Sequence, residues 1–179
     1  MPIKRVFYLF IVLIVACNHP DDKASHSPPQ DVNISTGNIL PSEVIWYAQS
    51  LKGVPYKYGS IDPAQGFDCS GFITYVFNHF GINVPRMSVD FTFAGHEVDL
   101  KDAKTGDLIL FTGTDTTGHI VGHMGIVLTS QGGEIKFIHS TSGKSHGVTE
   151  TLLNAYYKAR YVKTIRIFLQ NDLLDRKFK

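Results

Sequence analysis

The chain has 179 residues and a nearly balanced charge, with 17 lysines and arginines against 16 aspartates and glutamates. Its length suits one domain, and a hydrophobic fraction of 43% is too high for a wholly disordered protein. Without a basic excess, the composition argues against a nucleic-acid-binding protein. The two cysteines exclude a disulfide framework and a four-thiolate zinc site, and leave at most one intrachain bridge.

The N-terminal segment has the pattern of a bacterial export signal. Two basic residues precede an apolar run over 6–16 that is short for a membrane span. The run ends in Ile-Val-Ala-Cys at 14–17, which resembles the lipobox of bacterial lipoproteins. We therefore expect a signal peptide over 1–16, lipidation of Cys17, and a membrane-anchored lipoprotein of the cell envelope, on the periplasmic or outer-membrane side. A short membrane anchor with an incidental cysteine is the alternative.

Polar residues, prolines and glycines dominate the next segment, so residues 17–39 are predicted to form the lipidated cysteine and a flexible linker. The folded domain is expected over 40–170 and a short tail over 171–179. The first helix of the domain is predicted over 42–51, with Ser42 as its cap, and a loop rich in glycine and proline follows it.

A second helix is predicted over 69–80, because apolar residues recur at helical spacing between the capping residue Asp68 and Gly81. Shorter helices are predicted near 88–94 and 151–158. The remaining apolar or β-branched stretches are predicted as strands, at 107–111, 124–129, 135–139 and 161–168. Helices first and strands afterwards indicate an α+β fold rather than alternating βαβ units.

Cys69 stands in the predicted first turn of the second helix. The free N–H groups and the dipole at a helix start stabilise an anion, so we expect the pKa of this thiol to be lowered and the thiolate to act as a nucleophile. A buried structural cysteine is the alternative, but such a residue would belong on the apolar face of the helix rather than at its tip.

A nucleophilic cysteine needs a base, and that base needs an orienting partner. His123 begins one predicted strand and His139 ends another, so two neighbouring antiparallel strands could bring them together over the helix tip. His119 and His123 also have the His-x-x-x-His spacing of a zinc site. Two glycines and several β-branched residues argue against a helix there, and we expect no metal and no other cofactor.

Six motifs, in order, resemble those of the NlpC-type cell-wall peptidases, which are papain-like cysteine peptidases acting on peptidoglycan stem peptides. They are Gly-Val-Pro-Tyr-Lys-Tyr-Gly at 53–59, Phe-Asp-Cys-Ser-Gly-Phe at 67–72, Val-Pro-Arg at 84–86, Thr-Gly-Asp-Leu-Ile-Leu-Phe at 105–111, His-Met-Gly-Ile-Val at 123–127 and Phe-Ile-His-Ser at 137–140. Tyr156, Tyr157 and Arg160 resemble the closing segment. The resemblance implies a papain-like α+β domain whose nucleophile-bearing helix packs on an antiparallel sheet.

The resemblance implies that Cys69 attacks the scissile carbonyl, that His123 transfers the proton, and that His139 orients His123. Four further residues are implied as substrate contacts, namely Tyr58, Asp68, Ser70 and Arg86. Tyr58 is the implied second oxyanion donor, with aromatic packing as its alternative role.

N-capping is a competing role for Asp68, and a structural ion pair is the alternative role for Arg86. The sequence departs from the family pattern at Ser60, where the family has a second glycine. It also departs in the long stretch between Phe111 and His123, which is predicted to form an extra loop beside the site.

The short single-domain lipoproteins of the family are the most similar to this chain. The implied activity is that of a cysteine-type peptidoglycan endopeptidase that cuts D-alanyl–diaminopimelate or γ-D-glutamyl–diaminopimelate bonds. We expect a monomer whose partners are peptidoglycan stem peptides and, through Cys17, a membrane. A non-catalytic envelope binding module and a papain-like acyltransferase are the alternatives.

Overall fold

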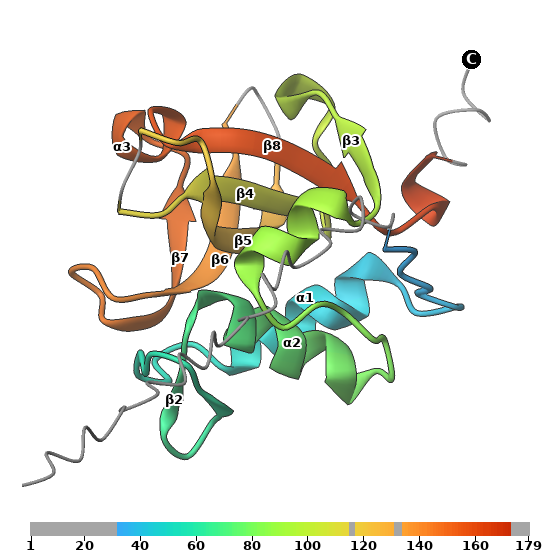
Figure 1. The fold of residues 1–179 in the computed structure, drawn as a ribbon. Coiled ribbons are helices and arrows are strands. Elements are labelled where there is room, and N and C mark those ends of the chain that lie inside the picture. The colour runs from blue at the N-terminus through green and yellow to red at the C-terminus, as the bar shows by residue number, and fades with distance from the viewer. Residues whose placement is uncertain (1–31, 115–116, 131–133, 173–179) are drawn as a thin grey trace, which may run out of the picture.

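The computed structural model describes residues 32–114, 117–130 and 134–172, so the predicted signal peptide and Cys17 lie outside the described residues. Two helices, α1 (Pro41–Ser50) and α2 (Cys69–His79), lie together beside an antiparallel sheet (Figure 1). None of the helices in the described ranges is both long enough and apolar enough to cross a membrane.

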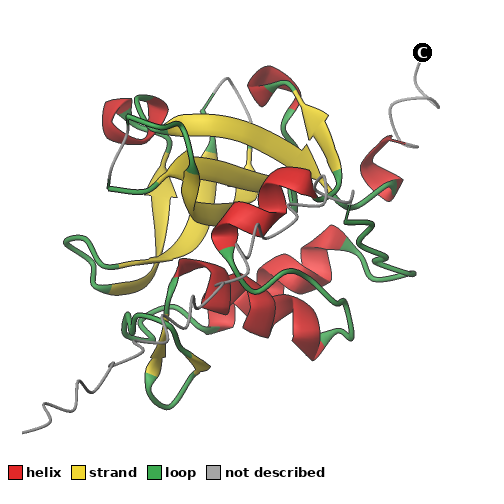
Figure 2. Cartoon of the chain, in the orientation of Figure 1, coloured by secondary structure: helices red, strands yellow, loops and turns green. Residues whose placement is uncertain are grey.

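The sheet has six strands in the order β3-β8-β4-β5-β6-β7, and each neighbouring pair is antiparallel. Figure 2 shows α1 and α2 together on one side of this sheet and the shorter helices elsewhere around it, which agrees with the predicted α+β fold. The strands are β3 (His96–Val98), β4 (Leu108–Thr112), β5 (Val121–Thr129), β6 (Lys136–Thr141), β7 (Gly147–Leu152) and β8 (Tyr161–Arg166).

Shorter elements fill the connections. A small hairpin of β1 (Ile61–Asp62) and β2 (Gly66–Phe67) precedes α2, where the sequence predicted only a loop. The predicted helix near 88–94 is the 3-10 helix η1 (Ser88–Phe93). A second 3-10 turn is η2 (Leu100–Asp102), and the short helix α3 (Ala155–Lys158) follows β7.

Side chains of the strands alternate between two apolar cores, one on each face of the sheet. Leu108 and Leu110 of β4 belong to the core that includes α1 and α2, whereas Ile109 and Phe111 belong to the core on the opposite face. Every residue of β4 is buried. This two-sided burial explains why the strand is a continuous apolar run rather than an alternating one.

The cap of α1 differs from the prediction. Ser42 does not cap this helix, because the helix already begins at Pro41, where a missing N–H costs no helical hydrogen bond. The side chain of Glu43 instead accepts a hydrogen bond of 2.7 Å from the N–H of Leu40. The helix therefore begins at Pro41, and its N-cap is Leu40, two residues before the predicted cap Ser42.

Residues 32–39, expected within the linker, lie against the domain. The N–H of Val32 donates to the carbonyl oxygen of Phe93 at 2.8 Å, and Ile34 is buried in the core. The side chain of Gln170 donates to the carbonyl of Ile39 at 3.2 Å. Apolar residues that alternate with polar ones are enough to fix this segment, so the folded part extends beyond the boundary expected at residue 40.

A buried ion pair joins the start of β4 to the end of β8. The guanidinium of Arg166 donates to both carboxylate oxygens of Asp107, at 3.0 and 2.9 Å. Arg166 also donates to the carbonyl of Asp102 at 2.8 Å and to the carboxylate of Asp172 at 2.6 Å. Asp107 is 0% exposed and also accepts a hydrogen bond of 2.8 Å from the N–H of Lys104, and Arg166 is 3% exposed, so both charges depend on contacts within the protein.

Candidate active site

Cys69 is the first residue of α2, where the sequence predicted it. The carboxylate of Asp68 caps this helix and accepts a hydrogen bond of 2.6 Å from the N–H of Gly71. A Cβ at position 71 would overlap the carbonyl oxygen of Ser60. Glycine is therefore required there so that the segment leading into the β1–β2 hairpin can lie directly against the start of α2.

The thiol of Cys69 lies beside the strand that carries His123. Its Sγ is 3.7 Å from the carbonyl oxygen of Gly122, the residue before His123 on β5. Helix α2 packs on β5 and β6, which holds the start of the helix at this end of the sheet. Cys69 is a free cysteine and is half-buried.

The two histidines that the sequence singled out are in contact. Nε2 of His123 lies 2.8 Å from Nδ1 of His139 on the neighbouring strand β6. Nε2 of His139 lies 3.0 Å from the hydroxyl of Thr151 on β7. A Cβ at Gly125 would lie 2.7 Å from the ring of Phe137, so this glycine lets β5 and β6 approach each other beside the histidines.

Because Nε2 of His123 is engaged with His139, Nδ1 of His123 is the nitrogen that remains for a proton transfer. The tautomers set the direction of hydrogen bonding along this row. In the tautomer in which Nε2 of His123 donates to His139, and His139 donates to Thr151, Nδ1 of His123 carries no hydrogen and can accept a proton. The sequence analysis missed Thr151, although the β-branched alternation at 148–151 is a signal for a strand there.

Aromatic rings surround the histidine pair and keep it uncharged. Phe111, Phe137 and Tyr157 lie against these imidazoles on the face of the sheet opposite α1 and α2. Burial lowers the pKa of His123 well below its ordinary value, and the neighbouring His139 and Arg160 lower it further. Burial and then the charge of Arg160 lower the pKa of His139 to about 3.

The buried neutral histidines predict a loss of stability as the pH falls from about 6.5 towards 3. His139 has an ordinary pKa of 6.5 and a native pKa of about 3, so in this interval the unfolded chain binds a proton that the native protein does not. The free energy of unfolding must then fall with the pH. Denaturant titrations of the wild type between pH 7 and 3.5 measure this slope.

His139→Asn is the matched variant for that measurement, because asparagine keeps a polar side chain but does not titrate. Its pH dependence of unfolding is expected to be flatter than that of the wild type. Glu150, whose pKa is lowered to about 2 mainly by Lys136, contributes equally to both proteins. Identical slopes in the two proteins would contradict a neutral, buried His139.

The pKa of the Cys69 thiol is raised, so the prediction of a lowered value is wrong. Burial is the largest cause, followed by the negative charge of Asp68. The N–H groups of Ser70 and Cys69 and the guanidinium of Arg86 act in the opposite direction, but their combined effect is smaller. The N–H groups at the helix start therefore lower the pKa of the thiol as expected, but burial and the charge of Asp68 raise it by more. At neutral pH the site holds a thiol and a neutral imidazole.

Three of the four predicted substrate contacts form one hydrogen-bonded cluster beside Cys69. Arg86 donates to both carboxylate oxygens of Asp68, at 3.1 and 2.6 Å, and to the hydroxyl of Ser70 at 3.1 Å. The N-cap of Asp68 and the ion pair of Arg86 are thus both present. Asp68 and Ser70 are buried, whereas the side chain of Arg86 is 38% exposed and is the member best placed to reach a bound peptide.

Tyr58, the fourth predicted contact, is 86% exposed and stacks on no aromatic ring in the described part of the chain. Its neighbour Tyr56 is half-buried, and the pKa of Tyr56 is raised by burial and then by the charges of Cys69, Asp68 and Tyr58. Tyr56 is therefore a tyrosine of this motif that lies in the electrostatic surroundings of Cys69. The sequence analysis missed it, although it follows Pro55 in the same motif.

Asp68→Asn is expected to make Cys69 more reactive. The change removes a negative charge that raises the pKa of the thiol and frees the charge of Arg86, which lowers it. Asparagine remains a good N-cap, so the start of α2 is retained. We expect alkylation of Cys69 by iodoacetamide at pH 7 to accelerate by about three- to tenfold, because the thiolate is the reacting form.

Asp99→Asn serves as the control, because this carboxylate is 72% exposed and pairs with a lysine on the surface. It is expected to leave the alkylation rate unchanged. Unchanged or slower alkylation of the Asp68→Asn protein would contradict the electrostatic role assigned to Asp68.

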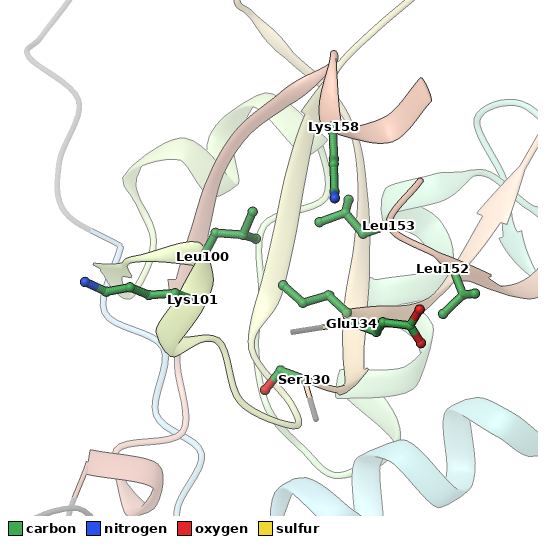
Figure 3. A pocket seen from close by; sticks show the side chains of 8 residues that line it. Leu100, Lys101, Ser130, Glu134, Leu152, Leu153 and Lys158 are labelled. Carbon is green, nitrogen blue, oxygen red and sulfur yellow. The ribbon is translucent and has the colours of Figure 1, made fainter. Parts of the chain in front are cut away.

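Two cavities of similar size lie beside the core on the face of the sheet opposite α1 and α2, and one of them adjoins His123. The first, of about 540 Å³, is lined by His123 and Thr151 together with Thr114, the loop 141–145, and Tyr156, Tyr157 and Arg160 around α3. Thr114 belongs to the long segment between β4 and β5, as expected of a loop beside the site. The second, of about 520 Å³, contains no residue of the catalytic cluster. Figure 3 shows its lining, which is Leu100, Lys101, Ser130, Glu134, Ile135, Leu152, Leu153 and Lys158.

The structure does not form the helical face that a His-x-x-x-His metal site needs. His119 is exposed in the loop before β5, with a positive φ of 50°, and His123 lies in the strand. Within residues 32–114, 117–130 and 134–172, no three side chains of His, Cys, Asp or Glu are grouped to hold a metal ion.

Comparison with known proteins identifies a family over the part of the chain that contains the six motifs. The NlpC/P60 family model matches residues 53–166. The chain is 32% identical over 124 residues to the gamma-DL-glutamyl hydrolase of Bacillus subtilis, which covers 69% of this chain and 29% of that protein. It is 29% identical over 174 residues to the murein DD-endopeptidase MepS/murein LD-carboxypeptidase of Escherichia coli, covering 87% of each.

Solved structures agree with this assignment of the fold. An NlpC/P60 family protein from Bacillus cereus superposes with a TM-score of 0.64 at 27% identity, over 74% of this chain and 42% of that one. The NlpC/p60 domain of the peptidoglycan hydrolase SagA superposes with a TM-score of 0.58 at 26% identity, over 72% of this chain and 99% of that domain.

Proposed function

The chain belongs to the NlpC/P60 family of cysteine peptidases, and from this premise we propose that it hydrolyses peptide bonds of peptidoglycan with Cys69, His123 and His139. The observation that carries the proposal is the row of groups at one end of the sheet. A thiol at a helix start lies beside β5, and His123 is held by His139, which is held by Thr151.

In the proposed reaction, Sγ of Cys69 bonds to the scissile carbonyl carbon while its proton passes to Nδ1 of His123. The imidazolium that forms keeps its second hydrogen bond to His139, which stabilises the charge. The N–H of Cys69 at the helix start donates to the oxyanion, and a tyrosine hydroxyl, from Tyr58 or its more buried neighbour Tyr56, is the proposed second donor. His123 then protonates the leaving amine, and water hydrolyses the thioester.

The proposed bond is the D-alanyl–diaminopimelate crosslink. The name of the Escherichia coli relative, a murein DD-endopeptidase, supports this choice, because the match covers 87% of both chains. The γ-D-glutamyl–diaminopimelate bond is the second candidate. It is supported by the gamma-DL-glutamyl hydrolase, of which this chain spans less than a third.

The proposal includes a location in the cell envelope, with Cys17 lipidated and the domain acting as a monomer on peptidoglycan. It is supported by the charged, apolar and lipobox-like segments at 1–17. Lipid chains on Cys17 would hold the protein at a membrane. The segment up to Val32 would then connect the lipid to the folded domain.

Digestion of defined peptidoglycan fragments tests the function. The purified full chain is incubated with crosslinked muropeptide dimers and, separately, with uncrosslinked monomers, and the products are identified by mass spectrometry. Conversion of dimers to monomers is expected, and cleavage of monomers after D-glutamate would identify the second bond instead. Iodoacetamide should stop the reaction and a chelator should not. No cleavage of either fragment would favour a binding module or an acyltransferase and overturn the proposal.

A further inference from the structure

The cavity of about 540 Å³ beside His123 takes no residue from α2. Its walls come from the loop between β6 and β7, which includes Lys144, and from the segment around α3, which includes Tyr156 and Arg160. His123 and Thr151 form one side of it. A ligand in this cavity would therefore contact His123 from the side of the sheet rather than from the side of the helix.

Among the described residues, the lining of this cavity carries positive charge and no carboxylate. Arg160 and Lys144 are the cations of this part of the lining, which contains no aspartate or glutamate. Most of the remaining lining is hydroxyl side chains, from serines, threonines and tyrosines. Neither cation forms an ion pair with any residue in the described ranges.

Arg160 is held in place by neutral partners. Its Nη2 donates to the carbonyl oxygen of Thr112 at 2.7 Å, and its Nη1 donates to the hydroxyl of Tyr156. The guanidinium also lies 5.0 Å from the centre of the Tyr156 ring. A guanidinium that is positioned but not neutralised is suited to bind a carboxylate, because its remaining N–H groups match the geometry of that anion.

The order of bond cleavage decides which part of the substrate meets this cavity. Once Cys69 has attacked, the acyl half of the substrate is bonded to α2. The amine half must leave from the side of His123, because this imidazole gives the amine its proton. A cavity that is lined by His123 and by no residue of α2 therefore lies where the leaving amino acid is expected.

We propose that this cavity binds the amino acid that leaves, through a free carboxylate held by Arg160 and Lys144. The proposal rests on the peptidase function and adds a substrate requirement to it. The substrates are peptides whose leaving residue is an amino acid with a free carboxylate, as diaminopimelate is. Peptides in which that carboxylate has been converted to a carboxamide should be poor substrates.

The test compares two synthetic D-alanyl–diaminopimelate peptides that differ only at the carboxyl group next to the scissile amide, free in one and a carboxamide in the other. The wild type should have a kcat/KM about 10- to 100-fold higher for the free acid, the range expected of a charge-assisted hydrogen-bond pair. Arg160→Gln should bring this ratio close to one. Lys144→Gln should reduce it less, since Lys144 is exposed on its loop.

Lys158→Gln is the matched control, because this lysine is also exposed and lies two residues before Arg160 in the chain but lines the other cavity. Its ratio should equal that of the wild type. Arg160 also lowers the pKa of both histidines. Any effect of Arg160→Gln on the base applies to both peptides alike and cancels in the ratio.

The outcomes separate the two proposals. A wild type that cleaves neither peptide, nor either muropeptide fragment, contradicts the peptidase function itself. A wild type that cleaves both peptides equally well overturns the carboxylate site, and so does an Arg160→Gln protein that keeps the preference. If circular dichroism shows that Arg160→Gln is unfolded, the wild-type ratio and its reduction in Lys144→Gln decide the question.

Discussion

Replacing Cys69 by alanine is expected to abolish peptidoglycan hydrolysis, with a fall in kcat of about 10⁴-fold or more, the scale seen when a covalent nucleophile is removed. No other thiol lies in the described part of the chain, so nothing can replace Cys69 there. The fold should be unaffected, because the thiol makes only a long contact of 3.7 Å with the carbonyl of Gly122. Release of soluble muropeptides from purified peptidoglycan measures the activity, and thermal unfolding checks the fold.

Cys17→Ser provides the control for thiol chemistry, since Cys17 is the other cysteine of the chain. The purified Cys17→Ser protein should hydrolyse peptidoglycan at the rate of the wild type. Activity of the Cys69→Ala protein within tenfold of the wild type would rule out Cys69 as the nucleophile, whatever the remaining geometry of the site.

The largest expected effect on stability comes from the buried ion pair. Asp107→Asn should lower the free energy of unfolding by about 3–5 kcal/mol, because it leaves the charge of Arg166 buried without its main partner. The native pair is 0% and 3% exposed, so solvent cannot take the place of the lost carboxylate. Urea or guanidinium unfolding at pH 7 measures the difference.

Two further variants show whether burial is the cause. Asp99→Asn breaks a pair with Lys101 in which both side chains are more than 70% exposed, and it should cost less than about 1 kcal/mol. The double variant Asp107→Leu with Arg166→Met removes both charges and should be less destabilised than Asp107→Asn alone. Equal losses in Asp99→Asn and Asp107→Asn would contradict the importance assigned to the buried pair.

Long apolar segments were predictable from the sequence, and short paired ones were not. The helix that carries Cys69, with Asp68 as its cap, and strands β4, β5, β6 and β8 all follow local patterns. Strand β7 pairs with β6 along its whole length, yet only its first two residues are buried and the burial along it does not alternate, so its pattern is weak. The predicted helix over 151–158 therefore covered its end, and only the part within α3 is helical.

In the site, too, the residues in local motifs were predictable from the sequence, and the contacts between distant segments were not. The motifs place Cys69, His123 and His139, but the order of partners that ends in Thr151 depends on the pairing of three strands. The thiol pKa was predicted in the wrong direction, because the sequence shows a helix start and does not show burial. The charge of Arg160 near the histidines likewise depends on the turn after α3, where Arg160 is held by the carbonyl of Thr112 at the end of β4.

The neutral resting state of the Cys69–His123 pair also affects how readily Cys69 is inactivated by oxidation. Peroxides attack thiolates far faster than thiols, and over-oxidation of a cysteine to its sulfinic or sulfonic acid is permanent. The raised pKa of Cys69 keeps the sulfur protonated when no substrate is bound. For a lipoprotein that works, as proposed, outside the reducing cytoplasm, this pairing confines the vulnerable form of the nucleophile to the moments of turnover.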